Sequence, residues 1–336
     1  MRINGLHIVD IVKVFVMVFV SVSLTSCEYK DLCYDHHHDE EPEYTATLVL
    51  ELKLDLDLDI DVSVEAHTKI LEPEYMKVCF YDPDNGALRY TEFVKGYGGP
   101  LSTPPGLYYL VAYSFGTEWT QIRDESNVNT IEAFTSDITA TKSAALAGFT
   151  RSGDYEAPGP IIYTPDHLLV AREPVTIPEL TAENRTVTIH ADGATIVETY
   201  GFTVTNVEGI EYIKSVEAFV TNQASGNFFG TGTRNNNPAT IYFPVEVNLT
   251  DRCLETSFNT FGKLPGESHS YLHILITDSE GKEYRTSTDI TDQFEKADHE
   301  IIIDEPIIIP KPEGGGSGIA PTVDEWEEEN HDVPIG

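Results

Sequence analysis

The sequence has few basic residues, and it has no long hydrophobic run beyond its amino terminus. Lysine and arginine together number 21, against 56 aspartates and glutamates, so the formal net charge is -35. Proteins bind nucleic acid largely through Lys and Arg contacts to phosphate, so this composition argues against a nucleic-acid partner. Downstream of residue 24, no apolar stretch reaches the length of about 20 residues that a transmembrane helix needs. We expect no membrane-spanning helix in the body of the chain.

The sequence also lacks the motifs of common catalytic sites. No two of its four cysteines have the CxxC spacing of redox or zinc sites. It contains neither the GxSxG turn of serine hydrolases nor the HExxH motif of zinc proteases. With so many acidic residues, the sequence neither selects nor excludes the carboxylate pair of a glycosidase. We therefore predict that the protein is not an enzyme and requires no cofactor.

The amino terminus has the features of a bacterial lipoprotein signal peptide. An apolar run at residues 14–24 is too short to span a bilayer, and the segment ends in the letters LTSC, whose last residue is Cys27. Lipoprotein signal peptidase accepts this pattern, and fatty chains on the new amino-terminal cysteine anchor a protein without a transmembrane helix. We predict that residues 1–26 are removed and that Cys27 is lipidated. The alternative is a chance cysteine after an ordinary signal peptide.

The three remaining cysteines, Cys33, Cys79 and Cys253, are an odd number, and we expect no disulfide framework. Residues 27–44 are polar and acidic, which suits a tether between the lipid and the body of the protein. From residue 48 to residue 64 every second residue is apolar, and the residues between them are polar except for Val49. A period of two over this length predicts one long strand with a single buried face.

Most of the remaining chain reads as short strands separated by turn residues. The best helical candidate is residues 129–148, and prolines interrupt the chain at residues 158–165 and 174–178. Further strands are predicted at residues 76–81, 107–115, 186–190, 195–204, 212–220, 240–247, 270–277 and 301–309.

This strand spacing favours an all-β fold with two β-sandwich domains in tandem. We place the first domain at residues 45–180, the second at residues 181–312, and a glycine-rich joint with a tail at residues 313–336.

Several short motifs occur in an order typical of one protein family. They are KDLCYDH at 30–36, MKVCFYD at 76–82, PGLY at 105–108, VAYSFGTE at 111–118, TFG at 260–262, DITDQ at 289–293, IIIP at 307–310 and VDEW at 323–326. This set resembles the fimbrillin-related, Mfa-like lipoproteins of the Bacteroidales, of the DUF5119 type. The resemblance implies two transthyretin-like sandwiches and no catalytic residues. It also implies a lipid-anchored protein of the outer membrane, exposed at the cell surface, that serves as anchor or minor subunit of a fimbria-like assembly. Fimbrillin-like subunits would then attach by strand exchange at a sheet edge.

Two groups of residues have side chains of the types that bind metals. The first comprises four aspartates on one strand face, about 6.6 Å apart along the strand, and the second lies in the tether. They are Asp55, Asp57, Asp59 and Asp61, and Cys33 with His36, His37 and His38. Carboxylates on a single strand cannot enclose calcium alone, and three adjacent histidines cannot all point at one ion. We therefore favour a solvated strand face and weak adventitious binding, and predict no metal site.

Aromatic residues support a second candidate function. Tyr97, Tyr108 and Trp119 would form a platform for sugar rings if they were exposed together, so a surface glycan-binding lipoprotein is the alternative. In the tail, Trp326 follows the glycine run at residues 314–318, where no core pattern requires a tryptophan. We predict that Ile319, Val323 and Trp326 bind a sheet edge, either of this molecule or of a neighbour.

Overall fold

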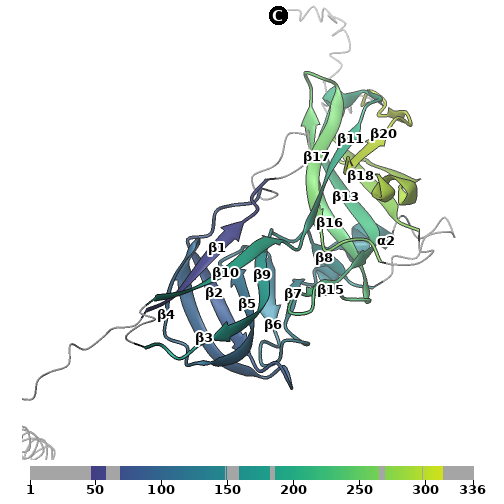
Figure 1. Ribbon diagram of the computed structural model, residues 1–336. Coiled ribbons are helices and arrows are strands. Elements are labelled where there is room, and N and C mark those ends of the chain that lie inside the picture. Colours follow the sequence, from purple (N-terminus) through teal and green to yellow (C-terminus); the bar gives the residue numbers. More distant parts are fainter. Residues whose placement is uncertain are drawn as a thin grey trace, which may run out of the picture. The chain divides into compact units, whose positions relative to one another are not determined.

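The computed structural model describes residues 47–57, 69–147, 149, 159–181, 186–264, 269–296 and 298–312 (Figure 1). Nearly all regular structure in these residues is β, and the one α-helix among them, α2, spans Thr139–Ala147. Two short 3-10 helices, η3 at Ile210–Tyr212 and η4 at Thr291–Glu295, complete the helical part of this description. The all-β fold class predicted from the sequence is confirmed.

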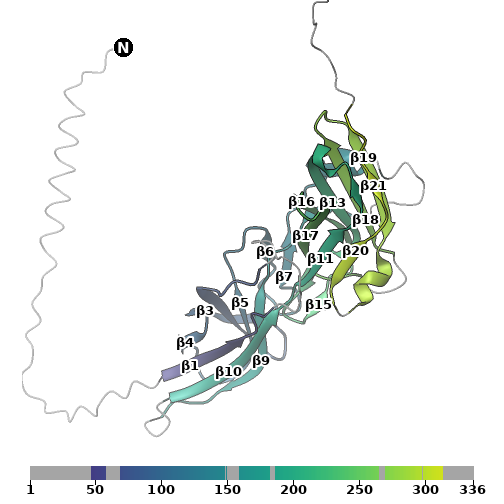
Figure 2. The ribbon, with the colours of Figure 1, turned by 90° about the horizontal axis from the view of Figure 1, so that it is seen from above.

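Seven strands close into a barrel in the order β1-β10-β9-β5-β2-β3-β4 (Figures 1 and 2). Their bounds are Thr47–Leu54 for β1, Tyr75–Tyr81 for β2, Leu88–Lys95 for β3, Gly98–Leu101 for β4, Gly106–Ser114 for β5, Leu169–Ile177 for β9 and Thr186–Thr195 for β10. The apolar positions of β1, Leu48, Leu50 and Leu52, point into the barrel core, whereas Glu51 and Lys53 are exposed. Apolar and polar alternation thus decides which face of β1 is buried.

The strand that begins at residue 47 is shorter than predicted. The sequence predicts one strand over residues 48–64, but β1 ends at Leu54, where its last partner in β10 is Gly193. Residues 58–64 of the prediction lie outside the described residues. The Asp55 amide still donates to the Gly193 carbonyl at 2.8 Å, and the Asp55 carboxylate then accepts from the Asp57 amide at 3.3 Å. This side-chain turn takes the place of a further ladder bond.

A second group of strands forms a sandwich around the largest apolar core. The sheet order is β19-β18-β13-β16-β17-β11-β20, with β8 paired to β16. The bounds are Ile161–Tyr163 for β8, Glu198–Val204 for β11, Ile213–Ala224 for β13, Pro238–Asn248 for β16, Cys253–Thr260 for β17, Tyr271–Asp278 for β18, Glu283–Asp289 for β19 and Glu300–Ile303 for β20. Strand β16 pairs with β13 along its first part and with β17 along its last three residues. It therefore passes from one sheet of the sandwich into the other.

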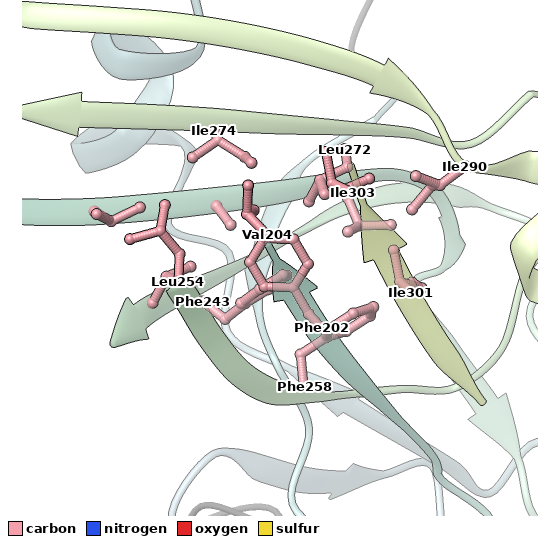
Figure 3. Close-up of a cluster of buried hydrophobic side chains, with 14 of the residues drawn as sticks. Phe202, Val204, Phe243, Leu254, Phe258, Leu272, Ile274, Ile290, Ile301 and Ile303 are labelled. Carbon is pink, nitrogen blue, oxygen red and sulfur yellow. The ribbon is translucent and has the colours of Figure 1, made fainter. Parts of the chain in front are cut away.

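The sandwich core is built from aromatic and branched side chains (Figure 3). Phe243 and Phe258 stack with ring centroids 4.4 Å apart, and Phe202 meets Phe243 edge to face. Ile301 and Ile303 of β20 reach into the same core from the end of the chain that the structure describes. Burial of these side chains is the main favourable contribution to folding of this part.

The predicted strand at residues 301–309 is divided in two. After β20 the chain passes Pro306, which has no N–H for a ladder bond, and continues as β21, Ile307–Ile308. Strand β21 pairs in parallel with β12, Val207–Glu208, as β20 pairs in parallel with β11.

A small four-stranded sheet covers part of the outside of the barrel. Its order is β15-β14-β7-β6, with bounds Thr233–Arg234, Gly226–Phe228, Glu132–Thr135 and Thr120–Arg123. Tyr113 of the barrel meets Phe229, which follows β14, with ring centroids 5.1 Å apart. The helix predicted over residues 129–148 is confirmed only for α2. Its first part is wrong, because pairing with β6 and β14 outweighs weak helix propensity in β7.

Strand pairing also crosses residue 180, where the sequence places a domain boundary. Strand β9 before it pairs with β10 after it, between Gly193 and Ala171 and between Thr195 and Leu169. Beyond Ala171 no further pairs join these two strands, and β9 continues to Ile177 as a partner of β5. The division into two domains at residues 45–180 and 181–312 stays a prediction.

A buried polar network lies at the junction of the barrel and the sandwich. His167 accepts from or donates to the hydroxyls of Thr195 at 2.7 Å and Thr199 at 2.9 Å. Thr199 donates to Asn259 Oδ1 at 2.6 Å, and Asn259 Nδ2 donates to the Pro165 carbonyl at 2.8 Å. Because the backbone turns from one sheet into the other here, these side chains satisfy polar groups that the ladders leave open.

Candidate functional site

Several predicted site residues fall outside the described part of the chain. They are the lipidation residue Cys27, the tether residues Cys33, His36, His37 and His38, and the tail residues Ile319, Val323 and Trp326. Within the described residues, no helix combines the length and apolar character that crossing a membrane requires. Cys79 and Cys253 are both buried and free.

Of the four aspartates considered for calcium, Asp59 and Asp61 also lie outside the described residues. Asp55 and Asp57 line a cleft with Asp192 and Tyr97, and Lys53 lies beside them. In the ranges that the structure covers, no three His, Cys, Asp or Glu side chains are grouped closely enough to hold a metal ion.

The three aromatic residues proposed as a sugar platform do not form one. Tyr97 is 54% exposed at the cleft with Asp55 and Asp57. Tyr108 is half-buried and packs against Tyr90, with ring centroids 5.8 Å apart. Trp119 is half-buried and packs against Tyr163, with ring centroids 4.1 Å apart. The platform required all three rings to be exposed together, and the half-buried positions of Tyr108 and Trp119 do not meet this condition.

The sheet edge formed by residues 300–309, which we call the C-terminal edge, has features that suit strand addition. On its inner side, the Ile303 carbonyl accepts from the Thr205 amide at 3.1 Å. On its outer side, Gln293 of η4 holds both main-chain groups of Ile302. Gln293 Oε1 accepts from the Ile302 amide at 2.9 Å, and Gln293 Nε2 donates to the Ile302 carbonyl at 3.3 Å. One side chain therefore makes the two bonds that a further strand would make.

The second half of this edge has no such cap. The amides of Ile307 and Ile309 donate to carbonyls of the neighbouring segment, both at 2.9 Å, so the main-chain groups of Ile308 face outward. No side chain of the described residues bonds to them. The side chain of Ile308 is 60% exposed and that of Ile302 is 44% exposed. This edge thus combines open main-chain groups with exposed apolar side chains.

Charged side chains protect the opposite edge of the sandwich from pairing with another chain. Strand β19 ends the sheet and exposes the charged residues Glu283, Arg285 and Asp289. Charged side chains on an edge strand discourage pairing with another chain. The contrast between β19 and the C-terminal edge makes the latter the better candidate for a contact with a partner.

Sequence reasoning did not identify Gln293, Ile302 or Ile308 as site residues, although two of the quoted motifs contain part of the site. DITDQ at 289–293 ends in Gln293, and IIIP at 307–310 contains Ile308. The structure brings these motifs to the same edge.

Comparison with known proteins identifies the family. The model of the family described as "Domain of unknown function (DUF5119)" matches residues 26–244, which is more than half of the chain. The chain belongs to this family. The match covers the barrel and much of the sandwich and ends before the C-terminal edge.

Two relatives come from Bacteroides ovatus. One is named "Putative fimbrium anchoring subunit Fim4B", and it is 24% identical over 302 residues, covering 78% of this chain and 85% of its own. The other is the crystal structure of a "putative adhesin", which is 21% identical with a TM-score of 0.52, over 85% of this chain and 99% of that one. The second comparison supports a common fold and the confirmed all-β class.

Proposed function

We propose that this protein is a lipid-anchored component of the cell envelope that anchors a fimbria-like surface assembly or forms one of its minor subunits. The fimbrium anchoring named for the relative supports this role. The lipoprotein pattern at Cys27 supports attachment to the outer membrane, with the body at the cell surface.

The observation that carries the proposal is the C-terminal edge. A partner strand added beside residues 300–309 makes main-chain bonds to Ile308 and replaces the amide of Gln293 at Ile302. The exchange at Ile302 conserves the number of hydrogen bonds, so its net cost is small. The exposed side chains of Ile302 and Ile308 lie on the solvent-facing face of the strands, where apolar side chains on the same face of the added strand can pack beside them.

Crosslinking on intact cells, followed by affinity recovery and mass spectrometry, tests the proposal. We expect the native protein to recover fimbrillin-like subunits and the Cys27→Ala variant to lose them from the membrane fraction. Recovery of the monomer alone, or of glycan transporters, would contradict the anchoring role and favour the glycan-binding alternative.

A second pair of variants tests the edge itself. Ile308→Lys places a charge on the edge, and we expect it to reduce subunit recovery at least ten-fold, as gatekeeper lysines do on natural edge strands. Leu107→Lys is the matched control, because Leu107 is 65% exposed but lies on β5 of the barrel. Equal recovery with both variants would show that the edge is not the contact.

The tail residues Ile319, Val323 and Trp326 supply a further candidate strand for the same edge. Deletion of residues 314–336 is expected to lower thermal stability if the tail binds this molecule, and to lower subunit recovery if it binds a neighbour. If neither quantity changes, the tail has no role in strand addition.

A further inference from the structure

A cleft of about 840 Å³ lies where the small sheet meets the junction of β10 and β11. The side chains that decide its chemistry are Arg172, Glu198, Asn227, Phe228, Arg234 and Asn236. This volume is within the range of small-molecule sites. We call it the arginine cleft.

The charge of the arginine cleft is opposite to that of the chain. Its lining contains two arginines and one glutamate, in a protein of formal net charge -35. Three other clefts of the described residues have more acids than bases. One is lined by Asp82 and Asp84 without Lys or Arg, and the other two each have a single lysine against at least three acids. The arginine cleft is therefore suited to an anion.

The two arginines differ in how they are paired. Arg234 forms an ion pair with Glu198 and donates to the Lys263 carbonyl at 3.3 Å. Arg172 is half-buried and donates to the Phe229 carbonyl at 3.3 Å, and no ion pair joins it to an acid of the described residues. A half-buried guanidinium without a counter-ion leaves several donors for a ligand.

Each guanidinium lies directly against a glycine with a left-handed backbone. A Cβ added at Gly232, with φ of 74°, would lie 1.9 Å from Arg172 Nη1. A Cβ added at Gly262, with φ of 106°, would lie 2.2 Å from Arg234 Nε. The turns at these glycines thus leave room for the arginines and limit where each can lie. A cation that is held in place loses less entropy when it pairs with a ligand.

Two amides add hydrogen-bonding groups to the lining. Asn227 is 6% exposed, and its Oδ1 accepts no hydrogen bond from the residues that the structure describes. Asn236 is exposed, and its side chain bonds to none of them. A buried oxygen without a donor is unfavourable, so the folded protein leaves the Asn227 amide incompletely satisfied beside the cleft.

We propose that the arginine cleft binds an acidic saccharide, with the uronate carboxylate paired to Arg172. A carboxylate takes two parallel hydrogen bonds from a guanidinium. Sugar hydroxyls both donate and accept, which suits the exposed amide of Asn236, and the half-exposed ring of Phe228 offers an apolar face. This site is independent of the anchoring role, because the C-terminal edge contributes none of the lining residues.

Isothermal titration of the whole mature protein with digalacturonate tests the proposal, and the methyl-esterified disaccharide serves as its uncharged match. We expect binding of the free acid and at least ten-fold weaker binding of the ester. Arg172→Gln is expected to lower affinity for the acid at least ten-fold, whereas Arg89→Gln leaves it unchanged, because Arg89 pairs with Asp82 elsewhere on the barrel.

Two further measurements keep the test independent of folding. Arg172→Lys retains the charge but not the fork of donors, so we expect intermediate affinity at an unchanged melting temperature. A short peptide ending in glutamate offers the same carboxylate without a sugar. Binding of the peptide alone, equal binding of acid and ester, or no binding of digalacturonate would each overturn the proposal. Loss of fimbrial subunit recovery, by contrast, has no bearing on this cleft.

Discussion

The buried imidazole of His273 should make stability fall as the pH is lowered. His273 is 1% exposed, on the face of β18 that also carries Leu275, and its ring lies 4.8 Å from that of Phe149. Its Nδ1 is 2.8 Å from the Ser287 hydroxyl. Burial disfavours the charged form and lowers the pKa of His273 from 6.5 to about 4.

The sign and size of the effect follow from proton linkage. Between pH 6.5 and pH 4 the unfolded chain binds a proton at this position that the folded chain does not bind. The stability contributed by neutral His273 is therefore complete above pH 6.5 and is lost progressively as the pH falls towards 4. Each pKa unit corresponds to about 1.4 kcal/mol, so the total loss is about 3 kcal/mol. This is a large part of the 5–15 kcal/mol typical of a folded protein.

Urea unfolding of the native protein and of His273→Gln, at pH 7.5 and at pH 4.5, measures this loss. Glutamine is neutral at both values, so we expect the native protein to lose about 2–3 kcal/mol more than the variant. His190→Gln, which removes an imidazole whose side chain is 74% exposed, controls for general effects of the substitution. The same pH dependence in the native protein and in His273→Gln would refute the reasoning.

Three further predictions concern the core and the junction. Asn259→Ala removes two buried hydrogen bonds and should lower the free energy of unfolding by about 2–5 kcal/mol in chemical denaturation, whereas a loss below about 1 kcal/mol would show that water replaces the amide. Leu50→Ala, in the barrel core, should cost about 2–5 kcal/mol and shift a single calorimetric transition, because Tyr113 and Phe229 join the barrel to the small sheet; a shift in only one of two transitions would show separate domains. Burial raises the pKa of the Cys79 and Cys253 thiols, so neither should react with iodoacetamide at pH 8 until urea is added, and mass spectrometry of the labelled peptides would reveal any exception.

The sequence pattern predicted strands that bury one face. It missed strands that expose both faces and strands that bury both faces. Strand β3 exposes most of its side chains, and β17 buries almost all of them. The polar residues of β17, such as Asn259, resemble a loop in the sequence because their hydrogen-bond partners come from distant segments. Pairing with those segments is tertiary information that a local pattern does not contain.

The candidate sites show the same limit. The composition indicates that anion binding is unusual for this chain, but Arg172 and Arg234 are far apart in sequence and line one cleft only after β14 and β15 fold over the barrel. Gln293 occurs in DITDQ, one of the motifs on which the resemblance to the family rests. Its contact with Ile302, however, depends on the position of η4 beside β20. Residue type was readable from the sequence, whereas proximity was not.

The pairing of β1 has a mechanical consequence. Strand β1 is parallel to β10 over all eight of its residues and antiparallel to β4 over four. A tension applied through the residues that precede Thr47 acts along the strand, nearly perpendicular to these hydrogen bonds. The bonds on both sides of β1 are then strained together in shear and do not open one after another from an end. A barrel attached through this strand should therefore withstand sustained pulling at its amino-terminal side.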